Sequence, residues 1–394
     1  MSRTGYSSFA LYDQRTYASR TKEREVCFRT DSPGLRVSDS TWAPKLGAIV
    51  MARSQREAKQ ILQLRYQVYT HEMGARLAGA DVERGELRDA LDPWSFLWYA
   101  QENGVAVGTI TQTMIADDFD LSLLPAELAL HNFPRSASQP VGFSSRFTIA
   151  PDHRGSWVLP AMARYTYAHG RELGAKFDFM LTRPALVPLF ERVGYLRYTT
   201  SAFRLRDFDL LIPMVLPATD YEHLRKVRSA CLPCAMHFPH EPEWGAWLRA
   251  SHPIIGTYYE SDPRCEQSGA ALTQRTSLPP HVAAELSSMS FVHHFQAGTS
   301  LHEPGDRMTC SYLKLRGQLS VRRDPHSNLI DFRQTTDGVA FTQDTIHCDS
   351  DAAVLCIPDS ALARIVRRYP EQALHVQQLL EDASVTTDSE ELLR

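Results

Sequence analysis

Apolar and polar residues alternate in blocks that predict helices and strands in turn. Residues 54–74 carry apolar side chains at helical spacing, including Ala58, Ile61 and Leu62. Residues 96–114 predict two strands around Asn103-Gly104, a pair typical of a tight hairpin turn. The remaining predicted elements are a strand near 147–149, a helix over 159–174, a strand over 177–184, a helix over 185–195 and a strand over 204–216. This order predicts a mixed α/β sheet.

The pattern changes after Pro279-Pro280, where short apolar runs alternate with glycine-containing turns. Such a texture predicts a small β-barrel or β-roll with helical flanks. Residues 1–45 show no periodic apolar pattern and predict a loose arm. The predicted organisation is a flexible arm at 1–45, an α/β domain at 46–230, a linker at 231–280 and a β-roll at 281–394.

Composition and charge narrow the function classes. The chain has 394 residues, of which 43% are hydrophobic and 22% charged, and its net charge is −4. Without a basic excess, nucleic acid is not an expected partner. No apolar run has the ~18 residues that a membrane span needs. The seven cysteines are mostly single, which fits a reducing compartment, so a cytoplasmic location is expected.

Two separated motifs resemble the GNAT acyltransferase superfamily. They are "HRGS" at 153–156 and "RPALVPLFERVGYLRY" at 183–198. A narrower resemblance rests on "LQLRYQVYTHEMG" at 62–74 and "SSRFTI" at 144–149. These segments are similar to motifs of acyl-homoserine-lactone synthases and, more closely, of long-chain N-acyl amino acid synthases. The resemblance covers roughly residues 55–230 and implies a GNAT-like α/β fold with N-acyltransferase activity.

The resemblance also implies a set of charged site residues. In the synthases, arginines at the positions of Arg65 and Arg146 pair with carboxylates that shape the acceptor site. The corresponding acids here are Glu86, Asp89 and Asp92. Their spacing of three would place them on one face if the segment were helical. For any one of these acids, a solvated surface position is an equally good interpretation.

One candidate base of the synthase pattern is missing. The homoserine-lactone synthases have Trp-Glu shortly before Ser-Arg, whereas Gly142 and Phe143 occupy these positions here. His71 and Glu72 are weaker substitutes, because both are expected on the surface of a helix.

The predicted donor site follows the strand that ends at Ile149. Backbone N–H groups at Phe147, Thr148 and Ile149 are expected to polarise the thioester carbonyl. The loop with Arg154, Gly155 and Ser156 is expected to bind a phosphate. Because this loop has few glycines, it fits the single phosphate of an acyl carrier protein's pantetheine arm better than the pyrophosphate of coenzyme A. Acyl-phosphopantetheine is thus the expected co-substrate, without a tightly bound cofactor.

The C-terminal part resembles the cyclic-nucleotide-binding β-roll in "FQAGTSLHEPGDRMTCSYLKLRGQLSV" (295–321) and "DSALARIVRRYP" (359–370). The Glu and Arg that hold a cyclic phosphate in that family are missing from 337–359. We therefore expect no cyclic-nucleotide binding and a packing or dimerisation role instead.

Cys231, Cys234, His237 and His240 invite a zinc interpretation. Four ligands within ten residues are cramped for a tetrahedral site, so no metal is predicted.

The sequence thus predicts a GNAT-like α/β acyltransferase domain plus a β-roll of cyclic-nucleotide-binding type. The expected activity moves a fatty acyl group from acyl carrier protein to the amine of an amino acid or similar small molecule. One alternative is a protein lysine acetyltransferase that uses acetyl-coenzyme A. Another is a sensor or scaffold without catalysis.

Overall fold

The computed structural model describes most of the chain from Ile49 onward. The described residues are 49–75, 77–205, 210–259, 272–273, 278–304, 306–307, 309–323 and 344–376. The predicted arm at 1–45 lies outside them. The described residues form two compact units, one from the residues up to Met114 together with Ser144–Met162, and the other from Ile115–Phe143 together with the described residues from Ala163 onward. No helix in the described part of the chain is long and apolar enough to cross a membrane.

The main sheet is large, and helices alternate with its strands along the chain in the order that the sequence predicts. Its strands follow the order β1-β4-β5-β6-β7-β10-β8, and β9 pairs with β10. The strands are β1 (Ile49–Met51), β4 (Ser95–Glu102), β5 (Val105–Ile115), β6 (Val141–Ile149), β7 (Phe177–Thr182), β8 (Leu196–Arg197), β9 (Phe203–Arg204) and β10 (Leu210–Pro217). The helices between them are α2 (Gln55–Tyr66), α3 (Val158–Glu172) and α4 (Val187–Val193). The predicted α/β architecture is confirmed.

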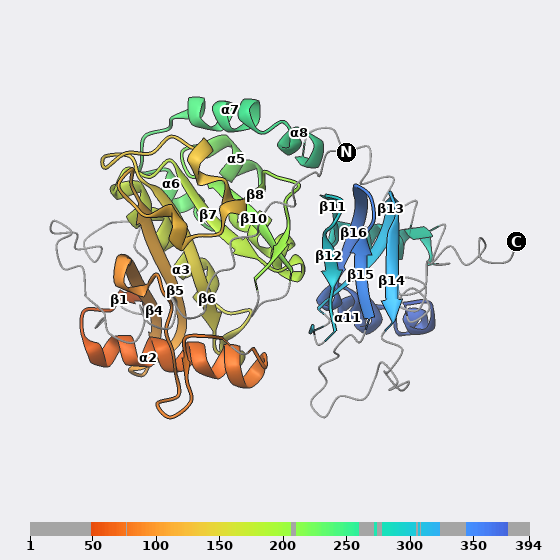
Figure 1. Ribbon diagram of the computed structural model, residues 1–394, viewed down its shortest axis with the longest axis horizontal. Coiled ribbons are helices and arrows are strands. Elements are labelled where there is room, and N and C mark those ends of the chain that lie inside the picture. The colour runs from red at the N-terminus through yellow and green to blue at the C-terminus, as the bar shows by residue number, and fades with distance from the viewer. Residues whose placement is uncertain are drawn as a thin grey trace, which may run out of the picture. The chain divides into compact units, whose positions relative to one another are not determined.

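In the first unit, α2 starts at a capping box. The Ser54 hydroxyl accepts a hydrogen bond from the Glu57 N–H, and the Glu57 carboxylate accepts from the Ser54 hydroxyl and the Arg53 N–H. Buried Ile61 packs in a cluster with Leu97 of β4, and α2 runs beside β4 in Figure 1. Helix α2 continues directly into a π-helix, Gln67–Glu72.

The predicted hairpin is confirmed. Glu102 of β4 pairs with Val105 of β5, and Asn103 and Gly104 between them have φ angles of 52° and 79°. Two positive φ angles are characteristic of a type I′ turn, which matches the twist of the strands. The turn therefore sets the pairing next to it, and the register shifts by one residue between Ala100 and Gln101 before β5 continues.

In the second unit, aromatic side chains pack against the face of β7. The rings of Phe177 and Phe179 lie 5.5 and 4.6 Å from the ring of Phe133, and Phe177 also contacts Trp247. Trp247 belongs to α7 (Pro242–Ser251), which is followed by α8 (Ile254–Tyr259). Both helices lie along the side of β8 and β10 in Figure 1. The segment predicted as a linker thus contributes helices to this core.

The C-terminal strands form two antiparallel sheets of three strands. One has the order β11-β16-β13 and the other β12-β15-β14. Their bounds are β11 (Phe291–Phe295), β12 (Ser300–His302), β13 (Cys310–Arg316), β14 (Leu319–Arg323), β15 (Asp344–Cys348) and β16 (Ala352–Pro358). Leu313 and Leu355 pack in one buried cluster with residues of α10 (Pro280–Ser288) and α11 (Asp359–Arg368).

These sheets and flanking helices agree with the predicted arrangement of short strands and helices. That the fold is a β-roll of the cyclic-nucleotide-binding type stays a prediction. Residues 324–343, which include the start of the segment where the cyclic phosphate would bind, lie outside the described residues. The predicted domain boundaries also stay a prediction.

Within the second unit, Arg197 ties β8 to the C-terminal strands. Its buried side chain donates to Glu191 at 2.8 Å and to the carbonyl of Val292 in β11. The guanidinium also lies 4.3 Å from the ring centre of Tyr258 and 4.9 Å from that of Phe291. A buried cation with this many partners is stable only while all of them stay in place.

We expect Arg197→Met to lower the free energy of unfolding by about 3 kcal/mol, because it leaves buried polar partners unsatisfied. Urea unfolding followed by circular dichroism measures this change. The control is Arg225→Met, since Arg225 pairs with Glu222 on the surface, and its effect should stay within about 0.5 kcal/mol. Equal effects of the two substitutions would show that the Arg197 contacts add no stability.

Candidate functional site

The end of α2 places a fully buried arginine beside an aspartate. Arg65 donates from Nη1 to both carboxylate oxygens of Asp92, at 2.9 and 3.0 Å. From Nη2 it donates to the Thr111 hydroxyl of β5 at 2.5 Å. Arg65 and Asp92 have relative side-chain exposures of 0% and 2%. Three hydrogen bonds from one guanidinium, removed from water in this way, fix its orientation.

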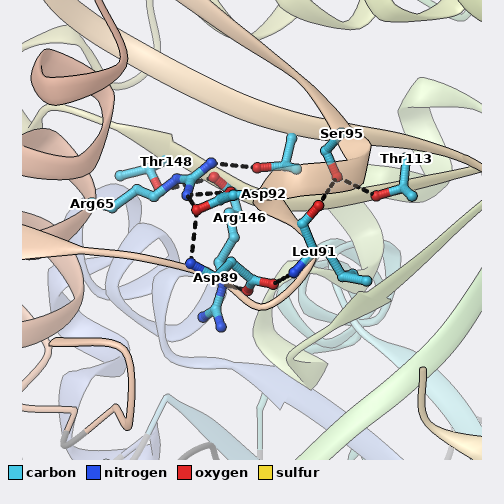
Figure 2. Close-up of polar contacts among 9 residues, drawn as sticks. Arg65, Asp89, Leu91, Asp92, Ser95, Thr113, Arg146 and Thr148 are labelled. Atoms are coloured by element: carbon cyan, nitrogen blue, oxygen red, sulfur yellow. Dashed lines mark hydrogen bonds and ion pairs between the residues drawn. The ribbon is translucent and has the colours of Figure 1, made fainter. Parts of the chain in front are cut away.

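Asp89 extends this pair into a four-residue network, which Figure 2 shows. Its N–H donates to Asp92 Oδ2 at 2.7 Å. Its carboxylate accepts from the Leu91 N–H at 2.9 Å and from Nε of Arg146. The chain of contacts therefore runs from Arg65 through Asp92 and Asp89 to Arg146, with the two aspartates between the two arginines, and their formal charges cancel. We call Arg65, Asp92, Asp89 and Arg146 the charge network.

The two carboxyl groups of the charge network differ in proton affinity. Burial acts to raise the pKa of Asp89, but the Arg146 charge and the Leu91 N–H outweigh it and lower that pKa. Burial raises the pKa of Asp92, and the negative charge of Asp89 adds to this shift against the opposing charge of Arg65. Asp89 is thus the more firmly ionised carboxylate.

The condition of a shared helical face is not met, and Glu86 stands apart from the other acids. Glu86 lies in β3 (Glu86–Leu87), which pairs with β2 (Ala80–Asp81), and it accepts from Arg88 at 3.0 Å. Asp92 lies in a short 3₁₀ helix, Asp92–Trp94. Tight turns rather than a helix bring Asp89 and Asp92 together. Arg65, Asp89, Asp92 and Arg146 form one network, whereas Glu86 pairs with Arg88.

Arg146 interrupts β6 with an unusual backbone conformation. Its φ angle is 52°, and among the described non-glycine residues with positive φ it alone lies inside a strand. A left-handed conformation of a residue other than glycine costs on the order of 1–3 kcal/mol. The hydroxyl of Thr148 donates to the Arg146 carbonyl at 3.1 Å, and Arg146 lies over the ring of Tyr69. Such strain beside a buried ion pair is typical of functional sites.

The structure places Phe147, Thr148 and Ile149 at the end of β6, directly after Arg146. Thr148 is buried, whereas Phe147 and Ile149 are half-buried. Polarisation of a carbonyl by these N–H groups stays a prediction.

In the predicted phosphate loop, the arginine already has an anionic partner. Arg154 donates from both terminal nitrogens to the two oxygens of Glu72, each at 2.6 Å. Gly155 has a φ angle of 72° with open space where a Cβ would lie. The Ser156 hydroxyl donates to the His153 carbonyl at 2.5 Å. The three loop residues are grouped as predicted, but the Arg154 guanidinium is shared with Glu72.

Sequence reasoning missed a stripe of threonines on β5. Thr109, Thr111 and Thr113 are all fully buried, and Thr113 shares a hydrogen bond of 2.7 Å with Ser95. Their spacing of two residues in a predicted strand places them on one face, and that signal was available. Nε of Arg65 and the hydroxyls of Thr109 and Ser145 are buried without a protein partner. In folded proteins such atoms usually bind water or a ligand.

The cysteine pair offers neither a metal site nor a reactive thiol. Cys231 and Cys234 are buried, and burial raises the pKa of each thiol to about 12. Across the described residues, no group of three or more His, Cys, Asp and Glu side chains could hold a metal ion.

The part of the chain that contains the charge network matches a known protein family. Residues 60–208 match the family described as "N-acyl amino acid synthase FeeM". The match indicates an N-acyltransferase. All four members of the charge network and the phosphate loop lie within the matched residues. No curated protein matches the chain.

Several solved structures resemble this acyltransferase distantly. TofI, in a ternary complex with an inhibitor and MTA, is 18% identical over 48% of this chain and 100% of its own, with a TM-score of 0.38. The AHL synthase LasI is 16% identical over 44% of this chain and 91% of its own, with a TM-score of 0.36. FeeM, an N-acyl amino acid synthase from uncultured soil microbes, is 12% identical over 48% of this chain and 97% of its own, with a TM-score of 0.33. These scores are too low to support a further conclusion about this chain.

The lowered pKa of Asp89 predicts an acid-sensitive contribution to stability. Its stabilising effect is present above the ordinary aspartate pKa of about 3.9 and is lost as pH falls through the lower folded-state value. Asp89→Asn should therefore be less stable than the wild type by about 2–4 kcal/mol at pH 6. The difference should shrink progressively as the pH is lowered from 5 towards 2.

Urea unfolding across this pH range tests the prediction. Asp81→Asn is the control, because Asp81 pairs with Arg84 on the surface at 3.7 Å. Its small effect should not change with pH. A wild-type advantage over Asp89→Asn that stays constant down to pH 2 would contradict the ionised pair.

Proposed function

We propose that this N-acyltransferase moves a fatty acyl group from acyl carrier protein to the amine of an amino acid or a similar small molecule. The observation that carries the proposal is the buried charge network, which lies within the matched residues and ends at the strained Arg146 of β6. Strain of this kind is retained where the surrounding contacts over-determine it, as at sites that position reactants. We further propose that the enzyme works in the cytoplasm.

The transfer requires a polarised thioester and a neutral amine. The amine nitrogen attacks the thioester carbonyl, the carbonyl oxygen becomes an oxyanion, and its collapse breaks the C–S bond. The thiolate then leaves, and the amine proton ultimately replaces the acyl group on sulfur. The backbone N–H groups that follow Arg146 in β6 would donate hydrogen bonds to the oxyanion and stabilise it.

The unpartnered polar atoms support a polar acceptor. Nε of Arg65 and the Thr109 and Ser145 hydroxyls can all donate hydrogen bonds. Leaving such donors buried without partners costs about 1–3 kcal/mol each. A small acceptor with an anionic or carbonyl group would remove that cost, and an amino acid carboxylate has this chemistry.

The phosphate loop supports a carrier-protein donor. Gly155 is its single glycine between Pro151 and Val158, so few backbone N–H groups can approach a phosphate closely. One phosphate group suits this loop better than two. Arg154 supplies the only positive side chain of the loop that stays charged at all working pH values.

We expect a fatty acyl carrier protein thioester to be used at least tenfold more efficiently than the matching coenzyme A thioester. The measurement is kcat/KM for the two donors, with N-acyl products from an amino acid mixture detected by mass spectrometry. Equal values for the two donors would overturn the carrier-protein assignment. Absence of any N-acyl product with either donor would overturn the proposed transfer itself.

Arg146→Lys should lower kcat/KM more than tenfold, because lysine keeps the charge but cannot reproduce the planar guanidinium contact with Asp89. The variant should still unfold cooperatively in urea. Arg84→Lys is the matched control, since Arg84 makes only a surface pair in the same unit, and its activity should stay close to the wild type. Full activity of Arg146→Lys would remove Arg146 from the site.

A further inference from the structure

The end of the π-helix holds an acidic side chain directly on the predicted phosphate-binding arginine. Both oxygens of Glu72 accept from Arg154 at 2.6 Å, so the pair is bidentate. Nε of Arg154 also donates to the Ile149 carbonyl at 3.3 Å, which holds the guanidinium beside the end of β6. The two side chains are 45% and 29% exposed. A dissolved ligand can therefore reach them.

A carboxylate on this guanidinium occupies the place of a phosphate. Carboxylates and phosphates both bind arginine through two oxygens in the same planar geometry. An exposed ion pair contributes only about 0–1 kcal/mol, so a phosphate can displace Glu72 from Arg154. After displacement, the carboxylate stays tethered a few ångströms away, and its negative charge acts on whatever phosphate has bound.

We propose that Glu72 determines the choice of acyl donor by charge, disfavouring free coenzyme A relative to the phosphopantetheine arm. This inference rests on the proposed function. The phosphate that joins pantetheine to a carrier protein is a diester with a single negative charge. Coenzyme A carries a pyrophosphate and a further phosphate monoester, with about four negative charges in total. Repulsion from Glu72 therefore weighs more heavily on coenzyme A.

The structure also provides a matched acidic residue beside the same loop. Glu102 at the end of β4 contacts His153 at 2.7 Å, next to Arg154 in sequence. It is exposed, and it pairs with His153 rather than with Arg154. Removing the Glu102 charge alters the net charge by the same amount as removing the Glu72 charge. A specific effect of Glu72 can thus be separated from a general change in net charge.

The experiment compares three donors that bear the same acyl chain and differ in charge. They are acyl-pantetheine, acyl-4′-phosphopantetheine and acyl-coenzyme A. For Glu72→Gln, we expect kcat/KM to rise about tenfold with acyl-coenzyme A, less with acyl-phosphopantetheine and not at all with acyl-pantetheine. The gain with acyl-coenzyme A should diminish in 0.5 M salt, because screening weakens repulsion between exposed charges.

Two further variants separate charge from structure. Glu72→Asp keeps the charge and should retain the wild-type order of donors. Glu102→Gln should leave the ratio of kcat/KM between acyl-coenzyme A and acyl-pantetheine within about twofold of the wild type. An unchanged donor ratio in Glu72→Gln, or an equal change in Glu102→Gln, would overturn the inference.

A binding measurement makes the outcome independent of turnover. Isothermal titration calorimetry with coenzyme A itself should show about tenfold tighter binding to Glu72→Gln than to the wild type at low salt. If the wild type forms N-acyl products but Glu72→Gln binds coenzyme A no more tightly, the inference fails and the proposed function stands. If no donor gives product while the tighter binding is observed, the proposed function fails and the charge effect stands.

Discussion

The buried pair of Arg65 and Asp92 is the constraint on which the rest of the site depends. Two charges removed from water are tolerated only when their hydrogen bonds are satisfied. Here the partners come from separate parts of the first unit: the end of α2, the turn before β4, and β5. Each of these segments must therefore be correctly placed before the pair can form. Asp92 also accepts a hydrogen bond from the Asp89 N–H, so the position of Asp89 depends on the pair. Asp89 in turn holds Arg146, and with it the end of β6.

This dependence gives the site residues a double role. The charge network, to which we assign a part in the acceptor site, also holds four segments of the first unit together. Loss of activity in a variant of the charge network can consequently arise from a displaced strand as well as from a missing contact. Measurements of stability and of activity must be read together for these residues.

The sequence predicted those parts of the fold that local chemistry decides. The hairpin follows from Asn103-Gly104, because these residues readily take the positive φ angles of its turn. The α2 helix follows from its apolar spacing. The strands β1, β2 and β3 were missed, since two or three residues are too few to show alternation. The left-handed conformation of Arg146 was also hidden, because no propensity of arginine favours it.

The site was predicted as a set of residues but not as a geometry. A motif resemblance named Arg65, Asp89, Asp92 and Arg146, and these four do meet in space. Which acid pairs with which arginine depends on contacts across 27 and 57 residues of chain, and no local pattern encodes them. The same resemblance also named Glu86, but this residue lies in β3 and pairs with Arg88 instead. The pairing of Arg154 with Glu72, across 82 residues, had no sequence signal at all.

The Arg197 contacts bear on how this chain can change over evolutionary time. A cation that is satisfied by the Val292 carbonyl and by the rings around it has become dependent on the segment that supplies them. If the C-terminal strands were lost in a single step, the Arg197 guanidinium would lose its contacts with Val292 and Phe291. It would then be exposed to water together with the ring of Tyr258. Arg197 would first have to be replaced by a residue whose side chain does not depend on contacts with the C-terminal strands. Loss of the C-terminal strands is therefore tolerated only after Arg197 has been replaced, which restricts the order in which these changes can occur.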